Sequence, residues 1–150
     1  MINARFTHTN VIARDWNKLT QFYQQVFGCI PLFPSKDYEG QWIEDATGVP
    51  GAKIRGIQLQ LPGYGDNGPT LEILQYTNQE RPMKPAANRP GFQHIAFSVD
   101  DVEAAQDAVI AAGGGMLGKI ASVDIPEVGR ATLVYLTDPE GNIIELQRRS

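Results

Sequence analysis

Four side chains that could bind a metal ion recur in a regular pattern along this 150-residue chain. The chain has two histidines, His8 and His94, and each stands seven residues before an aspartate and twenty residues before a glycine. Two glutamates, Glu72 and Glu145, lie within the apolar runs Leu-Glu-Ile-Leu and Ile-Ile-Glu-Leu. Because both histidines occupy the same place in an apparent internal duplication, we expect each half of the chain to supply one histidine and one glutamate to a common site.

Two imidazoles and two carboxylates make a plausible site for a divalent metal such as Zn, Ni, Co, Mn or Fe. Neutral nitrogen and anionic oxygen are ligands that suit borderline-to-hard cations. Each of the four residues, taken by itself, is better explained as a half-exposed or solvated strand residue. Taken together they favour the metal site, because glutamate is depleted in strands and an unpaired charge among apolar residues costs free energy.

The alternation of side chains along strands predicts which way these residues point. Successive strand residues face opposite sides of a sheet, and the apolar neighbours of His94, Glu72 and Glu145 are expected to pack on helices. The three polar side chains then lie on the face that helices leave open, and His8 follows by the repeat. The four side chains meet if the two sheets face one another.

The elements that would position these residues repeat in the two halves. Each half reads as strand, helix, strand, strand, strand, and the chain as one domain, residues 1–150. Module 1 covers residues 1–78, a proline-rich linker covers 79–90, and module 2 covers 91–150. The strands are predicted at 4–12, 30–36, 54–61, 70–76, 92–99, near 116–122, 131–137 and 143–147, with residues 37–52 as a loop.

The two predicted helices carry capping signals. Asp15 is a candidate N-cap for a helix over residues 16–27, and Gly28 ends that helix. In module 2, Asp100 followed three residues later by Glu103 has the form of a capping box.

Composition excludes several classes of partner. Hydrophobic residues make up 42% of the chain, which is ample for a core. A net charge of −4 with no basic face argues against a nucleic-acid partner and favours a small molecule. The absence of an 18-residue apolar run and of a signal-like leader predicts a cytoplasmic protein without a membrane partner. The single cysteine, Cys29, is expected to be a core residue.

With these features the chain resembles the vicinal oxygen chelate superfamily, which includes glyoxalase I, methylmalonyl-CoA epimerase, extradiol dioxygenases and fosfomycin- and bleomycin-resistance proteins. The resemblance rests on the two modules, the two first-strand histidines, the phrase around Glu72 and the ending Asp-Pro-Glu-Gly-Asn-Ile-Ile-Glu-Leu that contains Glu145. It implies an α+β fold in which two tandem βαβββ modules form a cupped, incomplete β-barrel with helices outside. It also implies that His8, Glu72, His94 and Glu145 bind the metal. Members are often homodimers, with ligands from one chain or two.

Among these members, glyoxalase I has the ligand pattern His, Glu, His, Glu that this chain matches, whereas the epimerase usually has glutamine where Glu72 stands. The resemblance implies a metal-dependent lyase or isomerase that moves a proton next to a metal-bound carbonyl. Its substrate would have vicinal oxygens or a thioester. Glu145 would act as metal ligand and base, and Glu72 as the opposed carboxylate. Glu44 is a weaker candidate for a second base.

Two alternatives come from other functional classes. One is a binding or resistance protein of the same fold, although bleomycin-binding members lack the ligand set. The other is an extradiol-type dioxygenase, although its two-histidine, one-carboxylate iron site leaves no role for Glu72. Trp42 and Tyr76 are candidate pocket-lining aromatics, and no basic residue is assigned to the substrate.

Overall fold

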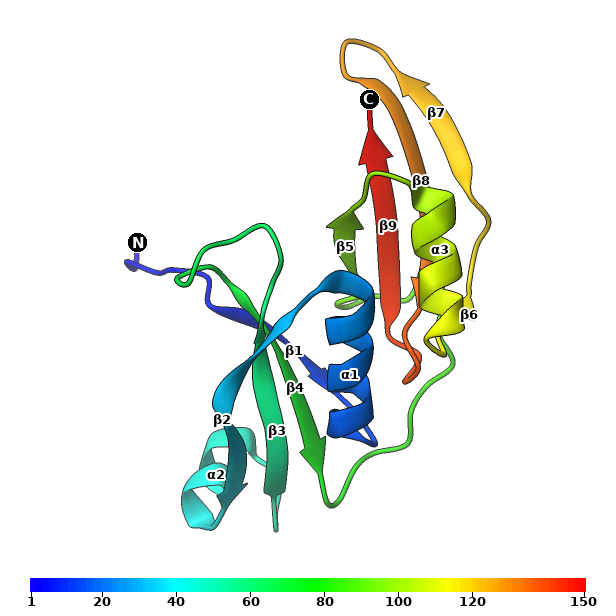
Figure 1. Ribbon diagram of the computed structural model, residues 1–150. Coiled ribbons are helices and arrows are strands. Elements are labelled where there is room, and N and C mark those ends of the chain that lie inside the picture. The colour runs from blue at the N-terminus through cyan, green and yellow to red at the C-terminus, as the bar shows by residue number, and fades with distance from the viewer. The chain divides into compact units, whose positions relative to one another are not determined.

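The computed structural model describes residues 1–150, which form three helices and nine strands in two compact units (Figure 1). Unit 1 comprises Met1–Arg81 and unit 2 comprises Pro82–Ser150, so the division falls within the segment predicted as a linker. Each unit has its own open sheet. The α+β class predicted from the sequence is confirmed.

Unit 1 begins and ends with strands that lie side by side. Its elements are β1 (His8–Ile12), α1 (Trp16–Phe27), β2 (Ile30–Glu39), α2 (Gln41–Thr47), β3 (Lys53–Gln60) and β4 (Thr70–Tyr76). The strand order is β1-β4-β3-β2, with β1 parallel to β4 and the other pairs antiparallel. The first and last strands of the unit can therefore carry side chains to one place.

Helix α1 is delimited by the two residues that the sequence suggested. The carboxylate of Asp15 accepts a hydrogen bond from the backbone N–H of Lys18 at 3.1 Å, and Gly28 ends the helix in the left-handed conformation with φ of 68°. The apolar side of α1 is buried and includes Leu19 and Tyr23. This side packs on β3 and β4 and covers one face of the sheet.

The segment predicted as a loop, residues 37–52, is instead the end of β2 followed by α2. Strand β2 is an edge strand, where prolines are tolerated, and Pro34 lies at a register shift between Leu32 and Lys36. Helix α2 is too short for its periodicity to be visible in the sequence. Its Ile43 enters a buried cluster completed by Ala52, Ile54 and Leu74.

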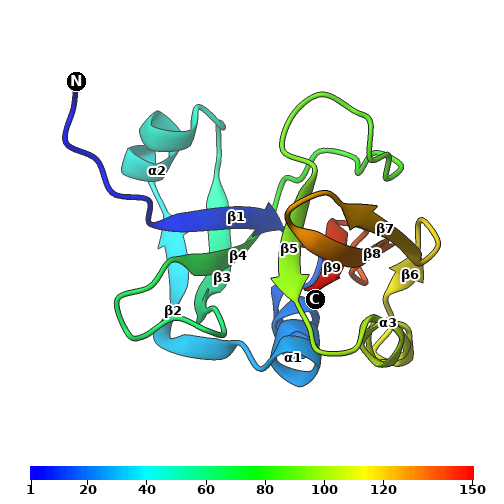
Figure 2. The ribbon, with the colours of Figure 1, turned by 90° about the horizontal axis from the view of Figure 1, so that it is seen from above.

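The register of β3 and β4 shows that α1 and α2 cover opposite faces of the unit 1 sheet. Ile54 pairs with Tyr76 and Gln58 pairs with Glu72, so these side chains share the face on which α2 packs. Figure 2 shows the two helices on opposite sides of this sheet. Helix α2 therefore closes part of the face that carries Glu72.

Unit 2 repeats the topology of unit 1. Its elements are β5 (His94–Ser98), α3 (Val102–Ala111), β6 (Gly115–Met116), β7 (Ala121–Ile125), β8 (Gly129–Thr137) and β9 (Ile143–Arg149). The order is β5-β9-β8-β6, with β5 parallel to β9, and β7 also pairs with β8. The single weak strand predicted near 116–122 is thus divided into β6 and β7.

The N-cap of α3 is Asp101, so the capping box predicted at Asp100 is wrong by one residue. Asp101 has extended backbone angles, and its carboxylate accepts a hydrogen bond from the N–H of Ala104 at 3.0 Å. A cap must directly precede the first helical residue, which here is Val102. Asp101 also stands where Asp15 stands in unit 1, seven residues after the histidine.

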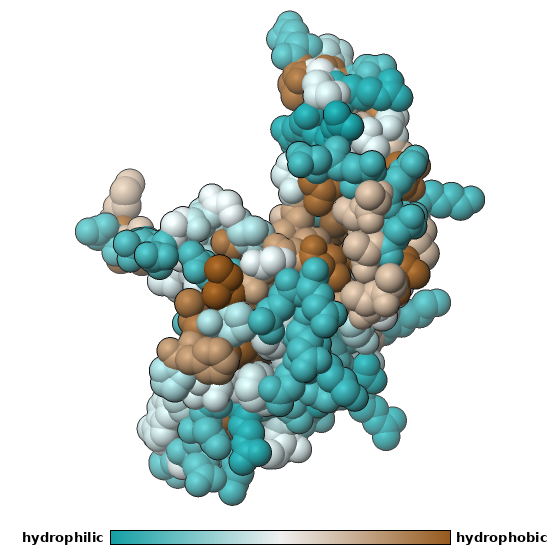
Figure 3. All heavy atoms as spheres, in the orientation of Figure 1, coloured by the Kyte–Doolittle hydropathy of each residue, from teal (hydrophilic) through white to brown (hydrophobic).

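The surface of the chain is mainly polar, with scattered apolar side chains. Figure 3 shows hydrophobic atoms at the surface of unit 1 among hydrophilic ones, and the start of β2 exposes Ile30, Leu32 and Phe33. The chain contains no helix with the length and apolar character needed to cross a membrane.

Candidate metal centre

In unit 1, the pairing of β1 with β4 brings His8 to Glu72. Asn10 is the register partner of Glu72, and His8 lies two residues earlier on the same face of the parallel pair. The distance between His8 Nε2 and Glu72 Oε2 is 3.5 Å. The Glu72 side chain is 10% exposed and the His8 side chain is 39% exposed, so the carboxylate is largely buried while solvent reaches the imidazole.

Glu72 has two further partners, which explains how its carboxylate can be buried. The Nζ atom of Lys36 donates to Oε1. The side-chain amide of Asn10 lies 3.2 Å from Oε2 and 3.2 Å from the backbone carbonyl oxygen of Glu72. A buried carboxylate is tolerated when it is paired and hydrogen-bonded, and Lys36 supplies the balancing charge.

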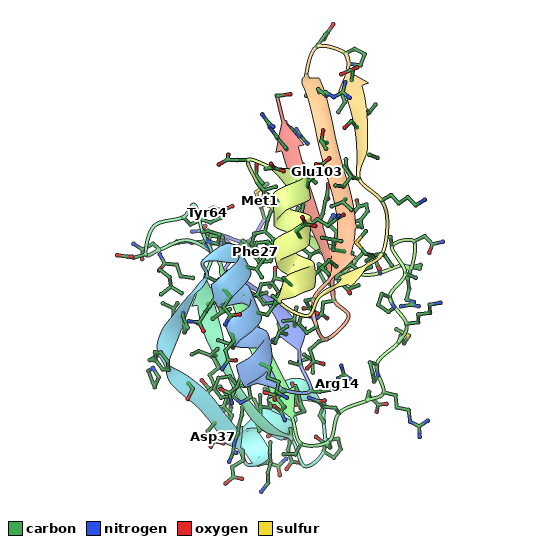
Figure 4. All side chains as sticks on the ribbon, turned by 45° about the vertical axis from the view of Figure 1, so that its right-hand side comes forward. Met1, Arg14, Phe27, Asp37, Tyr64 and Glu103 are labelled. Atoms are coloured by element: carbon green, nitrogen blue, oxygen red, sulfur yellow. The ribbon has the colours of Figure 1, made fainter.

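Lys36 reaches Glu72 from β2 by crossing β3 at a glycine. Its register partner is Gly56, where β3 and β4 approach so closely that an added Cβ would lie 2.0 Å from the carbonyl oxygen of Ile73. The next residue, Asp37, points away and forms an exposed pair with Arg55, and Figure 4 shows it at the periphery of unit 1.

The sequence alone assigns no role to Lys36. The strand was predicted to end there, and nothing in the local pattern indicates that Lys36 pairs with a glycine. If the strand is continued to Glu39, side-chain alternation places Lys36 on the same face as Tyr38. This alternation is the signal in the sequence that could have identified Lys36.

In unit 2, β5 and β9 hold the corresponding pair in the same way. Ala96 is the register partner of Glu145, and His94 lies two residues earlier. His94 Nε2 is 3.0 Å from Glu145 Oε2, with side chains 35% and 14% exposed. Ile144 and Leu146 on either side are buried, so Glu145 points to the opposite face, as the alternation of β9 predicted.

Tyr135 is a site residue that sequence analysis missed. It is the register partner of Glu145 on β8, and its ring contacts the His94 ring edge-on, with centroids 5.0 Å apart. Burial raises the pKa of Tyr135, and the negative charge of Glu145 and a hydrogen bond to that carboxylate raise it further. Buried Val134 and Leu136 on either side are the alternation that could have identified Tyr135.

The other aromatic candidates lie in unit 1, at the end of the sheet that α2 covers. Tyr76 packs against the cluster around Ile43, and burial, with the charge of Glu72 second, raises its pKa. The ring centroids of Trp42 and Tyr38 are 5.2 Å apart, and Trp42 is half exposed. Glu44, predicted in a loop, stands in the first turn of α2.

The structure thus brings the predicted site residues together as two pairs, one in each unit. No cluster of three or more histidine, cysteine, aspartate or glutamate side chains is found in the chain. That both pairs bind one ion stays a prediction.

Each pair fits two neighbouring ligands of a divalent metal. Bonds of about 2.0–2.2 Å place adjacent ligand atoms roughly 3.0–3.5 Å apart. The observed separations are 3.0 Å for His94 and Glu145 and 3.5 Å for His8 and Glu72. The hydroxyl of Thr7 lies 3.1 Å from Nδ1 of His8, an outer contact of the kind that leaves Nε2 for a metal.

The chain belongs to the glyoxalase/bleomycin resistance protein/dioxygenase superfamily, whose family description matches residues 5–146. Among curated proteins it is similar to a probable lactoylglutathione lyase of Vibrio parahaemolyticus. The two sequences are 30% identical over 149 residues, which cover 97% of this chain and 91% of the relative.

Solved structures of this superfamily share the fold. A glyoxalase family protein of Bacillus cereus matches with a TM-score of 0.80 at 16% identity, covering 99% of this chain and 96% of that one. A genomically encoded fosfomycin resistance protein of Listeria monocytogenes matches with a TM-score of 0.54 at 18% identity, covering 97% and 92%. That protein was solved as a mutant complexed with Mn(II) and dihydroxypropylphosphonic acid.

Proposed function

We propose that this protein is a divalent-metal-dependent lyase or isomerase, glyoxalase I-like or epimerase-like, that moves a proton next to a carbonyl group of a small molecule. The observation that carries the proposal is the paired arrangement of histidine and glutamate, which occurs once in each unit with the same register. The similarity to a probable lactoylglutathione lyase supports the reaction class.

We assign the metal to His8, Glu72, His94 and Glu145, supplied by one chain or by the two chains of a homodimer. A bound divalent ion acts as a Lewis acid that stabilises negative charge on a coordinated substrate oxygen. Nickel, zinc, cobalt, manganese and iron all suit this donor set. The substrate is expected to present vicinal oxygens or a thioester.

We assign the proton-moving role to Glu145. Glu72 is engaged by an ammonium group from Lys36 and by an amide from Asn10, whereas the polar contacts of Glu145 are to His94 and Tyr135. The Tyr135 hydroxyl, which donates to the Glu145 carboxylate, would hold that carboxylate in one orientation. Glu72 then serves as the opposed carboxylate.

The assignment is tested with the metal-loaded Glu145→Gln variant and the hemithioacetal of methylglyoxal and glutathione, the probe that the relative's name suggests. General-base catalysis contributes roughly 10²–10⁴-fold in rate, so kcat should fall by about that factor. Solvent deuterium incorporation into the product is the second readout. Glu103→Gln, on the exposed side of α3, is the matched control, and a fully active Glu145→Gln enzyme would remove Glu145 from this role.

One observation favours a second function. Lys36 balances the negative charge of Glu72 without any metal. This arrangement is expected in a protein that binds a small molecule and does not turn it over. Tight binding of a metabolite or drug without turnover, by a protein that takes up no metal, would support that alternative. Oxygen consumption with catechols would instead support a ring-cleaving dioxygenase.

We also propose a cytoplasmic homodimer. Light scattering coupled to size-exclusion chromatography measures the mass of the assembly directly, and a mass of one chain contradicts the dimer.

A further inference from the structure

Lys36 places a positive charge directly on a proposed metal ligand. Its side chain is 19% exposed, its Nζ atom donates to Oε1 of Glu72, and the same atom lies 5.9 Å from the centre of the Tyr38 ring. Both contacts favour an ammonium group at this position, because carboxylates and aromatic faces attract cations. The carboxylate of Glu72 is therefore already neutralised within unit 1.

The equivalent carboxylate of unit 2 has a different environment. Glu145 contacts His94 and Tyr135, and neither is a lysine or an arginine. The two pairs, related by the duplication and by their register, differ in the charge next to the carboxylate. An incoming cation meets competition at Glu72 and not at Glu145.

On the basis of the proposed metal site, we propose that Lys36 is the resident counter-ion of Glu72 and lowers the affinity of the His8–Glu72 pair for a divalent metal. Unit 2 consequently contributes more of the metal affinity than unit 1. Lys36 and the metal compete for one carboxylate, and two cations within a few ångströms repel each other.

Lys36 also has an effect that favours metal binding, and this effect is smaller than the competition for Glu72. Lys36 holds the Glu72 side chain in one orientation, and losing that restraint would weaken metal binding. The amide of Asn10, however, contacts both the backbone carbonyl and Oε2 of Glu72, and these two contacts do not involve Lys36. The removal of the competing charge therefore dominates.

The test is calorimetric titration of metal-free protein with zinc chloride, comparing wild type with Lys36→Met and Lys36→Gln. In wild type, zinc must displace the hydrogen bond between Lys36 and Glu72, and a hydrogen bond between charged groups corresponds to roughly a tenfold or larger change in affinity. Both variants lack this competitor and should therefore bind zinc at least about tenfold more tightly. Lys53→Met is the matched control, because it breaks the exposed Lys53–Glu39 pair of the same unit and changes the net charge equally. Its zinc affinity should stay within about twofold of wild type.

One variant and one measurement guard against a change that merely unfolds the protein. Glutamine keeps a hydrogen-bond donor for Glu72 without the charge, and circular dichroism identifies any variant that is not folded.

The outcomes separate this inference from the proposed function. Equal or weaker zinc binding by folded Lys36 variants overturns the counter-ion role while leaving the metal site intact. Failure of wild type and all variants to bind zinc, nickel or manganese overturns both proposals together.

Discussion

Glu72 and Glu145 are the same residue type at equivalent positions, yet their neighbours give them different properties. Glu72 is paired with an ammonium group and an amide, and Glu145 accepts from a phenol beside an imidazole. A carboxylate held by a neutral donor keeps its charge available. This difference is the reason for assigning base catalysis to Glu145 and not to Glu72.

Removing the hydroxyl of Tyr135 should slow the reaction without disturbing the fold. In Tyr135→Phe the ring can still contact His94, but Glu145 loses a hydrogen bond that orients it. A neutral hydrogen bond contributes about 0.5–1.5 kcal/mol, so kcat should fall roughly 2- to 10-fold with KM little changed. Steady-state kinetics checks this, with Tyr64→Phe, in the exposed loop visible in Figure 4, as control. An equal loss in both variants contradicts the role of Tyr135.

Cys29 should be chemically inert in the folded protein. Burial raises the pKa of its thiol from 9.0 to about 11, so the reactive thiolate is scarce at neutral pH. The unfolded thiol loses its proton at lower pH than the folded one, so this group makes the protein less stable as pH rises from 9.0 to about 11. Alkylation by iodoacetamide at pH 8 should be slow in buffer and fast in urea. Rapid labelling of the native protein would contradict the burial of Cys29.

The four ligand candidates and their faces could be predicted at the residue scale because apolar neighbours fix the alternation. Ile144 and Leu146 are buried, and this determines the direction of Glu145. Lys36 and Tyr135 could not be assigned in the same way. Their contacts depend on which residues stand opposite them on neighbouring strands, and a single sequence does not state that register.

At the scale of elements, the structure assigns the cap of α3 to one of two adjacent aspartates. Replacing an N-cap residue by alanine costs about 1 kcal/mol of folding free energy. Asp101→Ala should therefore lower the free energy of unfolding by about 1 kcal/mol. Asp100→Ala should leave it nearly unchanged. Urea denaturation followed by circular dichroism measures both, and a larger effect at Asp100 would show that Asp100, and not Asp101, caps the helix.

Helix α2 should depend on a single side chain. Ile43 is buried with Ala52, Ile54 and Leu74, so Ile43→Ala leaves a cavity where the helix meets the sheet. Such truncations cost roughly 2–5 kcal/mol. Ile110→Ala, at a partly exposed position of α3, should cost much less. Equal midpoints for the two variants in urea would show that Ile43 does not anchor the helix.

Elements with strong local signals were predictable, and those held by tertiary contacts were not. Helix α1 has an aspartate at its start, a glycine at its end and an apolar stripe between them. Helix α2 has seven residues and one buried side chain, so its stability comes from packing and not from periodicity. Strands β6 and β7 likewise exist because both pair with β8.

At the scale of the whole molecule, a duplicated unit explains why the site residues come in pairs. In each unit the first strand lies parallel to the last, and the histidine stands two residues before the register partner of the glutamate. The same backbone arrangement thus delivers the same two donors twice. The sequence displays this repeat through its two histidines, and membership of the superfamily agrees with it.

The metal content of the purified protein, measured by plasma mass spectrometry, tests the central claim most directly. We expect close to one divalent metal ion per site in wild type, and its loss in His94→Ala and Glu145→Ala after equal dialysis, with Glu103→Ala retaining it. Wild-type protein that holds no metal after reconstitution with nickel, zinc, cobalt, manganese and iron would contradict the metal centre. Metal retained in His94→Ala would contradict the assignment of its ligands.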